Sequence, residues 1–277
     1  CIRDRELDQL KKRLNVPVKE RWSDMEKHFD LVESRDDLYL EYVTLLNTLG
    51  EPKKALGLIM VRKFHQWEGG EGKVAAQYLT ALYQLAKAAV AKEDYAEAKE
   101  LLLRAVDEYP HNLGEGKLES AQENNLYYLL GLAQEKLGET EEAFVNLTKA
   151  CYGESEPVGM MYYNDQPPEM IYYQGLAYRK LGDEEQAVQR FCKLVDYGKE
   201  HIGDEIKIDY FAVSLPDLLI FEENLNERNR KHCLFMMSLG LKGLGRSDEA
   251  EKCAEELLAM DLSLIHISEP TRPLYIS

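Results

Sequence analysis

The sequence lacks the residue patterns that mark most metal, redox and hydrolase sites. Its five cysteines include no CxxC pair, its six histidines show no HExxH or other paired ligand spacing, and no serine lies in a GxSxG motif. We therefore assign no catalytic residue and expect no metal and no cofactor. The cysteines are expected to be small buried side chains in a reduced compartment, with Cys233 at the start of a helix.

Positive charge and long apolar runs are also scarce. The 277 residues include 34 Lys and Arg against 50 Asp and Glu, which gives a formal net charge of −16. Such an acidic surface repels nucleic-acid phosphates and anionic lipid headgroups, so we expect neither nucleic acid nor a membrane as a partner. No apolar stretch is long enough to span a bilayer, and we expect a cytoplasmic protein.

A phosphate-binding loop is missing, although Gly-Glu-Gly-Lys occurs twice, at Gly70–Lys73 and Gly114–Lys117. Both copies lack the first glycine and the hydroxyl of the pattern GxxxxGK[ST], so we do not expect nucleotide binding. Two interpretations remain open. The glycines can shape the start of the next helix, with the Glu near its positive end. Alternatively, these segments contact a ligand or another domain through His65, Trp67, Glu71, Lys73, Glu115 and Lys117.

One pattern of small and apolar residues recurs five times along the chain. Each copy has a Gly or another small residue, then a turn, then Ala and a large apolar residue at fixed offsets. The clearest copies are Leu130-Gly131 … Gly138 … Ala143 … Leu147 … Ala150 and Gly175 … Tyr178 … Gly182 … Ala187 … Phe191, and the others run from Val43, Leu85 and Ser238. Small residues permit two helices to cross closely, and the turn glycine can take a positive φ.

These five segments resemble tetratricopeptide repeats, and the resemblance covers residues 35–261. It implies an all-α fold, a right-handed helical solenoid with long insertions between the repeats. Residues 1–34 are interpreted as a degenerate N-terminal helical pair. Residues 262–277 resemble a translated sequencing adapter and are predicted to be a non-native tail.

The repeats are spaced more widely than usual. The marker residues Ala55, Ala98, Ala143 and Ala187 lie further apart than the roughly 34 residues of an ordinary unit, and the gap to Ala250 is the longest. Each connection therefore carries an insert. Inserts in repeat proteins map to one face, which is often the binding face.

An aromatic ladder is predicted along the groove. In a tetratricopeptide unit the second and fifth places of the first helix face the concave side. The fifth places are Leu40, Tyr83, Tyr128, Tyr172 and Phe235, and Asn125 is one of the second places. Such a ladder suits an extended peptide, a docked helix or a sugar face. The alternative is that the inserts fold into the groove and the ladder packs against them.

The inserts and repeats together resemble the C-terminal half of large bacterial proteins that join a β-rich domain of unknown function to tetratricopeptide repeats. Two functional hypotheses follow. The first is a non-enzymatic scaffold that binds a protein segment, or its own N-terminal domain, through the groove and the inserts. The second is the helical half of a carbohydrate-binding or carbohydrate-processing enzyme, whose sugar site would include Trp67, Tyr163, Asn164, Asp165 and Asp209.

Overall fold

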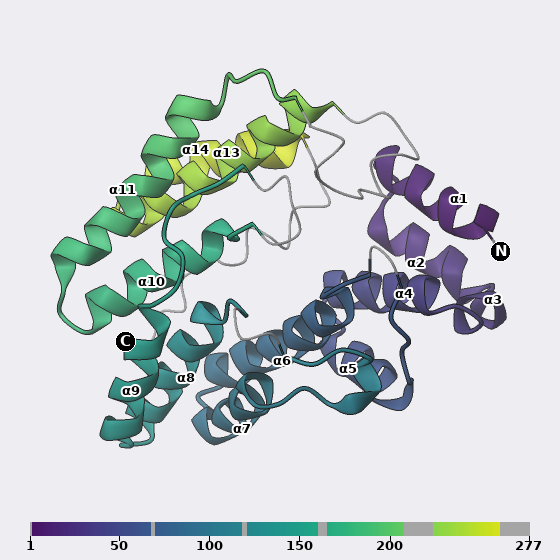
Figure 1. Ribbon diagram of the computed structural model, residues 1–277, viewed down its shortest axis with the longest axis horizontal. Coiled ribbons are helices and arrows are strands. Elements are labelled where there is room, and N and C mark those ends of the chain that lie inside the picture. Colours follow the sequence, from purple (N-terminus) through teal and green to yellow (C-terminus); the bar gives the residue numbers. More distant parts are fainter. Residues whose placement is uncertain (1, 68–69, 118–120, 160–164, 208–223, 261–277) are drawn as a thin grey trace. The chain divides into compact units, whose positions relative to one another are not determined.

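The computed structural model describes residues 2–67, 70–117, 121–159, 165–207 and 224–260. Throughout these residues the regular elements are helices, and no strand occurs among them (Figure 1). The prediction of an all-α fold is therefore confirmed. No helix in these ranges is both long enough and apolar enough to cross a membrane.

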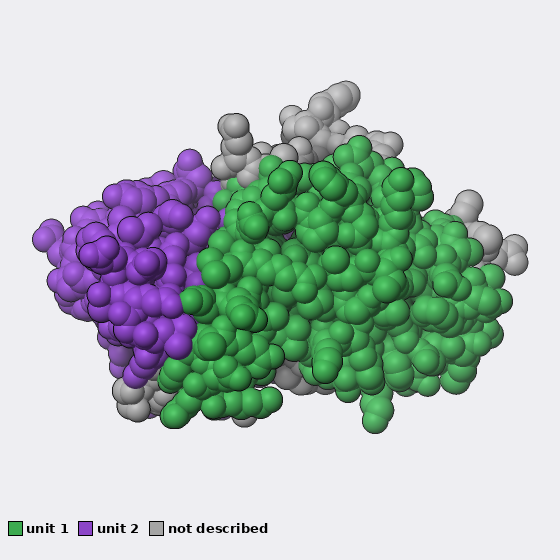
Figure 2. All heavy atoms as spheres, turned by 90° about the horizontal axis from the view of Figure 1, so that it is seen from below, with its two compact units in different colours: residues 1–121 green, residues 122–277 purple. Residues whose placement is uncertain are grey.

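The chain divides into two compact units, residues 1–121 and residues 122–277 (Figure 2). The predictions for Tyr163, Asn164, Asp209 and the tail at 262–277 lie outside the described residues.

Unit 1 contains an N-terminal group of helices followed by two antiparallel helix pairs. Within it α4 packs on α5, α5 on α6, and α6 on α7, so each helix contacts the next along the chain. The elements are α1 (Ile2–Arg13), α2 (Val18–Glu26), α3 (Phe29–Glu33), α4 (Asp36–Thr48), α5 (Pro52–Val61), α6 (Lys73–Ala91), α7 (Tyr95–Val106) and the short 3-10 helix η1 (His111–Leu113).

A buried ion cluster joins the N-terminal helices to the first pair. The Arg21 guanidinium donates hydrogen bonds to the two carboxylate oxygens of Asp8 at 3.0 and 2.6 Å, and to Glu41 of α4 at 2.7 Å. Burial raises the pKa of Asp8, and the hydrogen bond from Arg21 opposes that rise. Arg21 of α2 thus links α1 to α4, and removing one partner would leave an uncompensated buried charge.

The described residues of unit 2 form three antiparallel helix pairs. Asn224 caps its third pair by accepting a hydrogen bond from the Glu227 amide at 3.2 Å. That helix therefore begins before Cys233, and the expectation that Cys233 opens it is wrong: Cys233 lies buried in its interior. The elements are α8 (Asn124–Lys136), α9 (Thr140–Ala150), α10 (Pro168–Lys180), α11 (Glu184–His201), α13 (Leu225–Gly243) and α14 (Ser247–Met260).

The turn inside four of the five pairs is made by a glycine with positive φ, as the sequence predicts. The φ angles are 74° at Gly50, 80° at Gly138, 88° at Gly182 and 74° at Gly245. The α6–α7 pair has no glycine there, and Glu93 takes the left-handed conformation with a φ of 62°. A glycine adopts this conformation without steric cost, which explains why it recurs at this place.

Close helix crossings explain the glycines that come before the turn in the repeated pattern, such as Gly131 and Gly175. A Cβ added at Gly131 would lie 2.7 Å from Leu147 Cγ, and one added at Gly175 would lie 2.4 Å from Phe191 Cε1. The same Phe191 ring would meet a Cβ at Gly243 at 2.2 Å. Phe191 of α11 therefore contacts the glycine backbone of both α10 and α13, and it is fully buried.

Two of the cysteines are buried, as expected for small apolar side chains. Burial raises the pKa of the Cys151 and Cys233 thiols to about 11. Cys192 and Cys253 are partly exposed, and all four of these cysteines are free thiols. Thiols with raised pKa values remain protonated near neutral pH and are poor nucleophiles, which agrees with a packing role.

Substituting Gly175 tests the crossing directly. We predict that Gly175→Ala lowers the free energy of unfolding by about 1–3 kcal/mol, because the methyl group must displace the Phe191 ring. The matched control is Gly57→Ala in α5, where an added Cβ meets nothing within 4 Å. That change should stabilise the helix by about 0.5–1 kcal/mol. Urea denaturation followed by far-UV circular dichroism measures both, and equal effects of the two variants would contradict the packing argument.

Candidate functional site

The first two inserts of unit 1 are held together by backbone and amide hydrogen bonds. The Phe64 amide donates to the Asn112 carbonyl at 2.8 Å, and the Asn112 side chain donates to the carbonyls of Ile59 and Arg62 at 2.8 and 2.9 Å. Gly114 approaches so closely that an added Cβ would lie 2.7 Å from the Phe64 carbonyl oxygen. Hydrogen bonds therefore join two insert segments that lie 50 residues apart in the sequence.

Asp36 of α4 anchors the beginning of the first insert. Its carboxylate accepts hydrogen bonds from Arg62 Nε at 2.7 Å and from the His65 amide at 2.9 Å, and His65 Nδ1 lies 3.1 Å from it. Burial raises the pKa of Asp36, but these hydrogen bonds outweigh burial and leave the pKa below its usual value. The carboxylate therefore stays ionised at neutral pH and keeps this part of the backbone in place.

Glu115 of the second insert caps helix α6. Its carboxylate accepts hydrogen bonds from the amides of Gly72 and Ala75 at 2.7 and 2.9 Å. Gly72 precedes the helix with a φ of 72° and has no side chain with which to cap it. Glu71 was expected near this helix start, but it is exposed. Glu115, from the second copy of the motif, supplies the cap instead.

The two lysines of the repeated motif have different positions. Lys117 donates to the Val106 carbonyl at 2.6 Å, at the C-terminal end of α7 where a cation is favoured. Lys73 is the first residue of α6 and is exposed. Neither lysine is among the residues that line the cavity described next.

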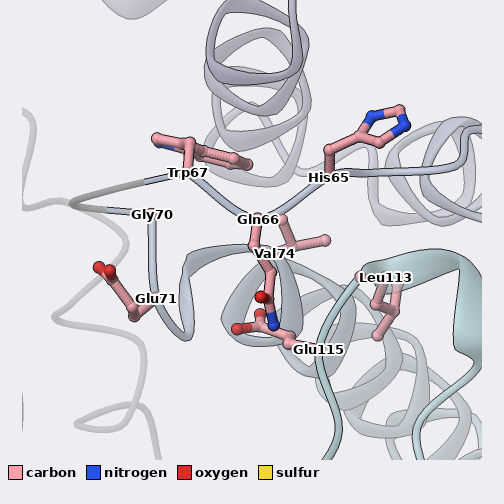
Figure 3. Close-up of a pocket in the computed structure, with 9 residues that line it drawn as sticks. His65, Gln66, Trp67, Gly70, Glu71, Val74, Leu113 and Glu115 are labelled. Carbon is pink, nitrogen blue, oxygen red and sulfur yellow. The ribbon is translucent and has the colours of Figure 1, made fainter.

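A cavity of about 400 Å³ opens between the two inserts (Figure 3). Its apolar part includes Val74 and Leu113, each 2% exposed, together with the half-buried Trp67. The Trp67 ring lies against the backbone of Gly70, where an added Cβ would be 2.2 Å from Cε2 of the indole. The lining residues are His65, Gln66, Trp67, Gly70, Glu71, Val74, Leu113, Gly114 and Glu115.

Figure 3 shows how the labelled side chains surround this pocket. Trp67 and Glu71 lie toward one end and Leu113 toward the other, with Val74 and Glu115 between them. The pocket therefore combines an aromatic ring, an apolar floor and two carboxylates. The sequence predicted a contact role for His65, Trp67 and Glu71 but did not single out Gln66, Val74 or Leu113, which carry no motif.

The fifth-place residues of unit 1 differ in exposure. Leu40 is 5% exposed and belongs to the core. Tyr83 is half-buried, and the Lys87 ammonium lies 5.8 Å from the centroid of its ring. Tyr83 therefore keeps part of its ring accessible, and Leu40 does not.

In unit 2 the predicted ladder is partly a packed aromatic cluster. Tyr172 is 5% exposed, and its ring centroid lies 5.7 Å from those of both Tyr173 and Phe191. Tyr128 is half-buried and lies 5.6 Å from Tyr173. Burial raises the pKa of Tyr128 and Tyr172 to about 12, so both hydroxyls are neutral at physiological pH. Phe235 packs partly buried against the core between α13 and α14.

Polar side chains of α10, of α13 and of the third insert itself hold this insert. His232 Nε2 donates to the Val158 carbonyl at 2.8 Å, and the amides of Gln166 and Gln174 both donate to the Glu154 carbonyl at 2.8 Å. For this part of unit 2, these contacts favour the alternative in which an insert packs against residues of the predicted groove.

The remaining unit 2 candidates lie at helix starts. Asn125 is the second residue of α8 and Asp165 lies just before α10, and both are half-buried. Burial lowers the pKa of His232, while the Asp165 charge acts in the opposite direction. Asp165 therefore lies near His232 within unit 2.

Models of the tetratricopeptide repeat family match three segments, at residues 80–112, 125–152 and 169–197. In these three segments the match is to the tetratricopeptide repeat. The matched segments fall on α6–α7, α8–α9 and α10–α11. The predicted fold class, an all-α arrangement of tetratricopeptide repeats with inserts, is confirmed.

Two solved structures are similar to this chain. Both contain the nearly identical TPR-like repeats of a protein described as a kinesin light chain from Podosopora anserina, and one is a single-substitution variant. Each is 16% identical over 84% of this chain and 95% of that chain, with TM-scores of 0.34 and 0.33.

The helix cap by Glu115 gives a local prediction. Glu115→Ala should weaken the first turn of α6 by about 1 kcal/mol, because two backbone amides lose their acceptor. Hydrogen exchange at the Ala75 amide should then accelerate roughly fivefold. Glu71→Ala is the control, since Glu71 accepts neither of these bonds. Unchanged exchange in Glu115→Ala would show that the cap contributes nothing to the helix.

Tyr172 gives a second prediction, on stability. Tyr172→Ala should lower the free energy of unfolding by about 3–5 kcal/mol, because the ring fills the core between Tyr173 and Phe191. Tyr83→Ala should cost much less, because that ring is only half-buried. Urea midpoints of the two variants measure the difference, and a smaller loss for Tyr172→Ala than for Tyr83→Ala would place Tyr172 in the groove after all.

Proposed function

We propose that this protein is an interaction scaffold that binds a segment of a protein partner at the unit 1 pocket. Tetratricopeptide repeats are generally protein-interaction scaffolds, and the helices of such repeats hold the loops between them in fixed positions. The partner is a separate protein or a further domain of the same protein. Tyr83 and Tyr128 are proposed as additional contact residues.

The observation that carries this proposal is the joining of two inserts into one cavity. Asp36, Asn112 and Glu115 hold the inserts through hydrogen bonds to backbone groups. A pocket whose walls are already ordered loses less conformational entropy when a ligand binds. Ordered insert loops on one face of a repeat array are therefore a suitable docking place.

The size and lining of the cavity suit a peptide side chain. Its volume of about 400 Å³ lies at the small end of the roughly 300–1,000 Å³ of ligand sites. The aromatic lining residue is Trp67, and tryptophan is among the residue types that most often dominate the binding energy at protein interfaces. Val74 and Leu113 offer apolar surface, while the exposed Gln66 and Glu71 offer polar groups.

A sugar site would use the same Trp67. The other residues of that hypothesis are divided: Asp165 lies in unit 2, and Tyr163, Asn164 and Asp209 are outside the described residues. No specific observation favours carbohydrate, so we propose a protein segment as the ligand.

The test is a selection of displayed random peptides on the whole chain, followed by calorimetry with the enriched peptides. Trp67→Ala should weaken their binding about tenfold or more, because the main aromatic contact is lost. Phe144→Ala is the matched control, since Phe144 is an aromatic residue 62% exposed on α9. Circular dichroism verifies that each variant is folded. Enriched peptides that bind Trp67→Ala as tightly as the wild type would refute the pocket as the docking place.

The tyrosines are tested with the same peptides. Tyr83→Ala should weaken the binding of long peptides about threefold to tenfold, and Tyr128→Ala should do so if the segment extends to unit 2. Short peptides that fill only the pocket should bind both variants normally. If neither tyrosine affects any peptide, the groove plays no part and the pocket alone binds.

A further inference from the structure

We infer that the unit 1 pocket recognises a cationic side chain, and that an arginine of the partner segment fits it best. This inference rests on the proposed function, because it names the chemistry of the residue that enters the same pocket. It starts from the charges of the lining residues. Glu71 and Glu115 line the cavity, and among the described residues that line it there is no Lys or Arg.

The two carboxylates have different roles. Glu115 already accepts two backbone hydrogen bonds at the start of α6, and the positive end of that helix offsets part of its charge. Glu71 is exposed and accepts neither of these bonds. Glu71 is therefore the carboxylate placed to accept hydrogen bonds from a ligand.

Two cationic side chains near the pocket, those of Arg62 and Lys117, are bound to other groups. The Arg62 guanidinium is bound to Asp36 at 2.7 Å and lies 4.4 Å from the Tyr39 ring centroid. The Lys117 ammonium is bound to the carbonyl of Val106. Arg62 and Lys117 are thus held by groups that do not line the pocket, and neither of them is bound to its carboxylates.

Trp67 supplies the second element of cation recognition. Among aromatic side chains the indole ring attracts a cation most strongly. Its position is restricted because Gly70 lies directly against it, and it lines the cavity while remaining half-exposed. Trp67 and Glu71 lie toward the same end of the pocket (Figure 3), where an indole ring and a carboxylate are both available to a cation.

Arginine fits this combination better than lysine. Its planar guanidinium can stack on the indole and donate two parallel hydrogen bonds to one carboxylate, whereas an ammonium is a compact, strongly hydrated charge. The aliphatic part of either side chain can pack on Val74 and Leu113. The overall charge of −16 further favours a basic partner segment.

The experiment uses Trp67 as its own reporter. The chain has two tryptophans, so Trp22→Phe leaves Trp67 as the only one. The full chain with this change is titrated at low salt with an acetylated, amidated Gly-Arg-Gly peptide, and then with the same peptide carrying citrulline, the neutral isostere of arginine. We expect a saturable change in Trp67 emission, at least about fivefold weaker binding of the citrulline peptide, and weaker arginine binding as salt is added.

A matched pair of variants locates the carboxylate. Glu71→Gln should weaken the arginine peptide about fivefold and leave the citrulline peptide unchanged. Glu100→Gln, at an exposed position on α7 in the same unit, should change neither. Equal effects of the two substitutions would mean that only the general surface charge matters, which overturns the site.

The remaining outcomes separate the two proposals. Equal binding of the arginine and citrulline peptides, or no response to either, overturns the cation inference, while the scaffold proposal still stands or falls on the displayed peptides. If N-acetylglucosamine changes Trp67 emission and the arginine peptide does not, both the cation inference and the protein-segment proposal are wrong, and the pocket is a sugar site.

Discussion

Close helix crossings at glycine are the constraint on which this structure depends. Phe191 is fully buried and contacts backbone at Gly175 and Gly243, so α10, α11 and α13 can pack only at the distance that these glycines permit. Gly131 plays the same part against Leu147 between α8 and α9. These crossings fix the distance between the helices from which the inserts extend.

The inserts are ordered by the ends of the helices. Helix termini leave backbone amides and carbonyls without partners inside the helix, and the insert side chains supply those partners. Glu115 satisfies amides at the start of α6, and Lys117 satisfies a carbonyl at the end of α7. The same hydrogen bonds that complete the helices thus hold the walls of the pocket beside Trp67.

Sequence reasoning succeeded where a residue's role depends on its own helix pair. The turn glycines and the small residues at the crossings both follow from local geometry. It failed where a residue interacts with another that lies far away in the sequence. The Glu115 cap joins groups 40 and 43 residues apart, and Tyr172 turned out to pack on Phe191 because burial depends on a neighbouring helix. Val74 and Leu113 line the pocket without any motif that could mark them.

The central claim is that the joined inserts form a preformed docking place for a protein segment. The most direct measurement is two-dimensional NMR of the labelled chain during titration with a peptide selected on it. We predict that the Trp67 indole N–H signal shifts together with the backbone amides of Gln66 and Glu71, and that the signal of Phe144 stays in place. Shifts confined to other residues, with the Trp67 signal unmoved at saturation, would contradict the account.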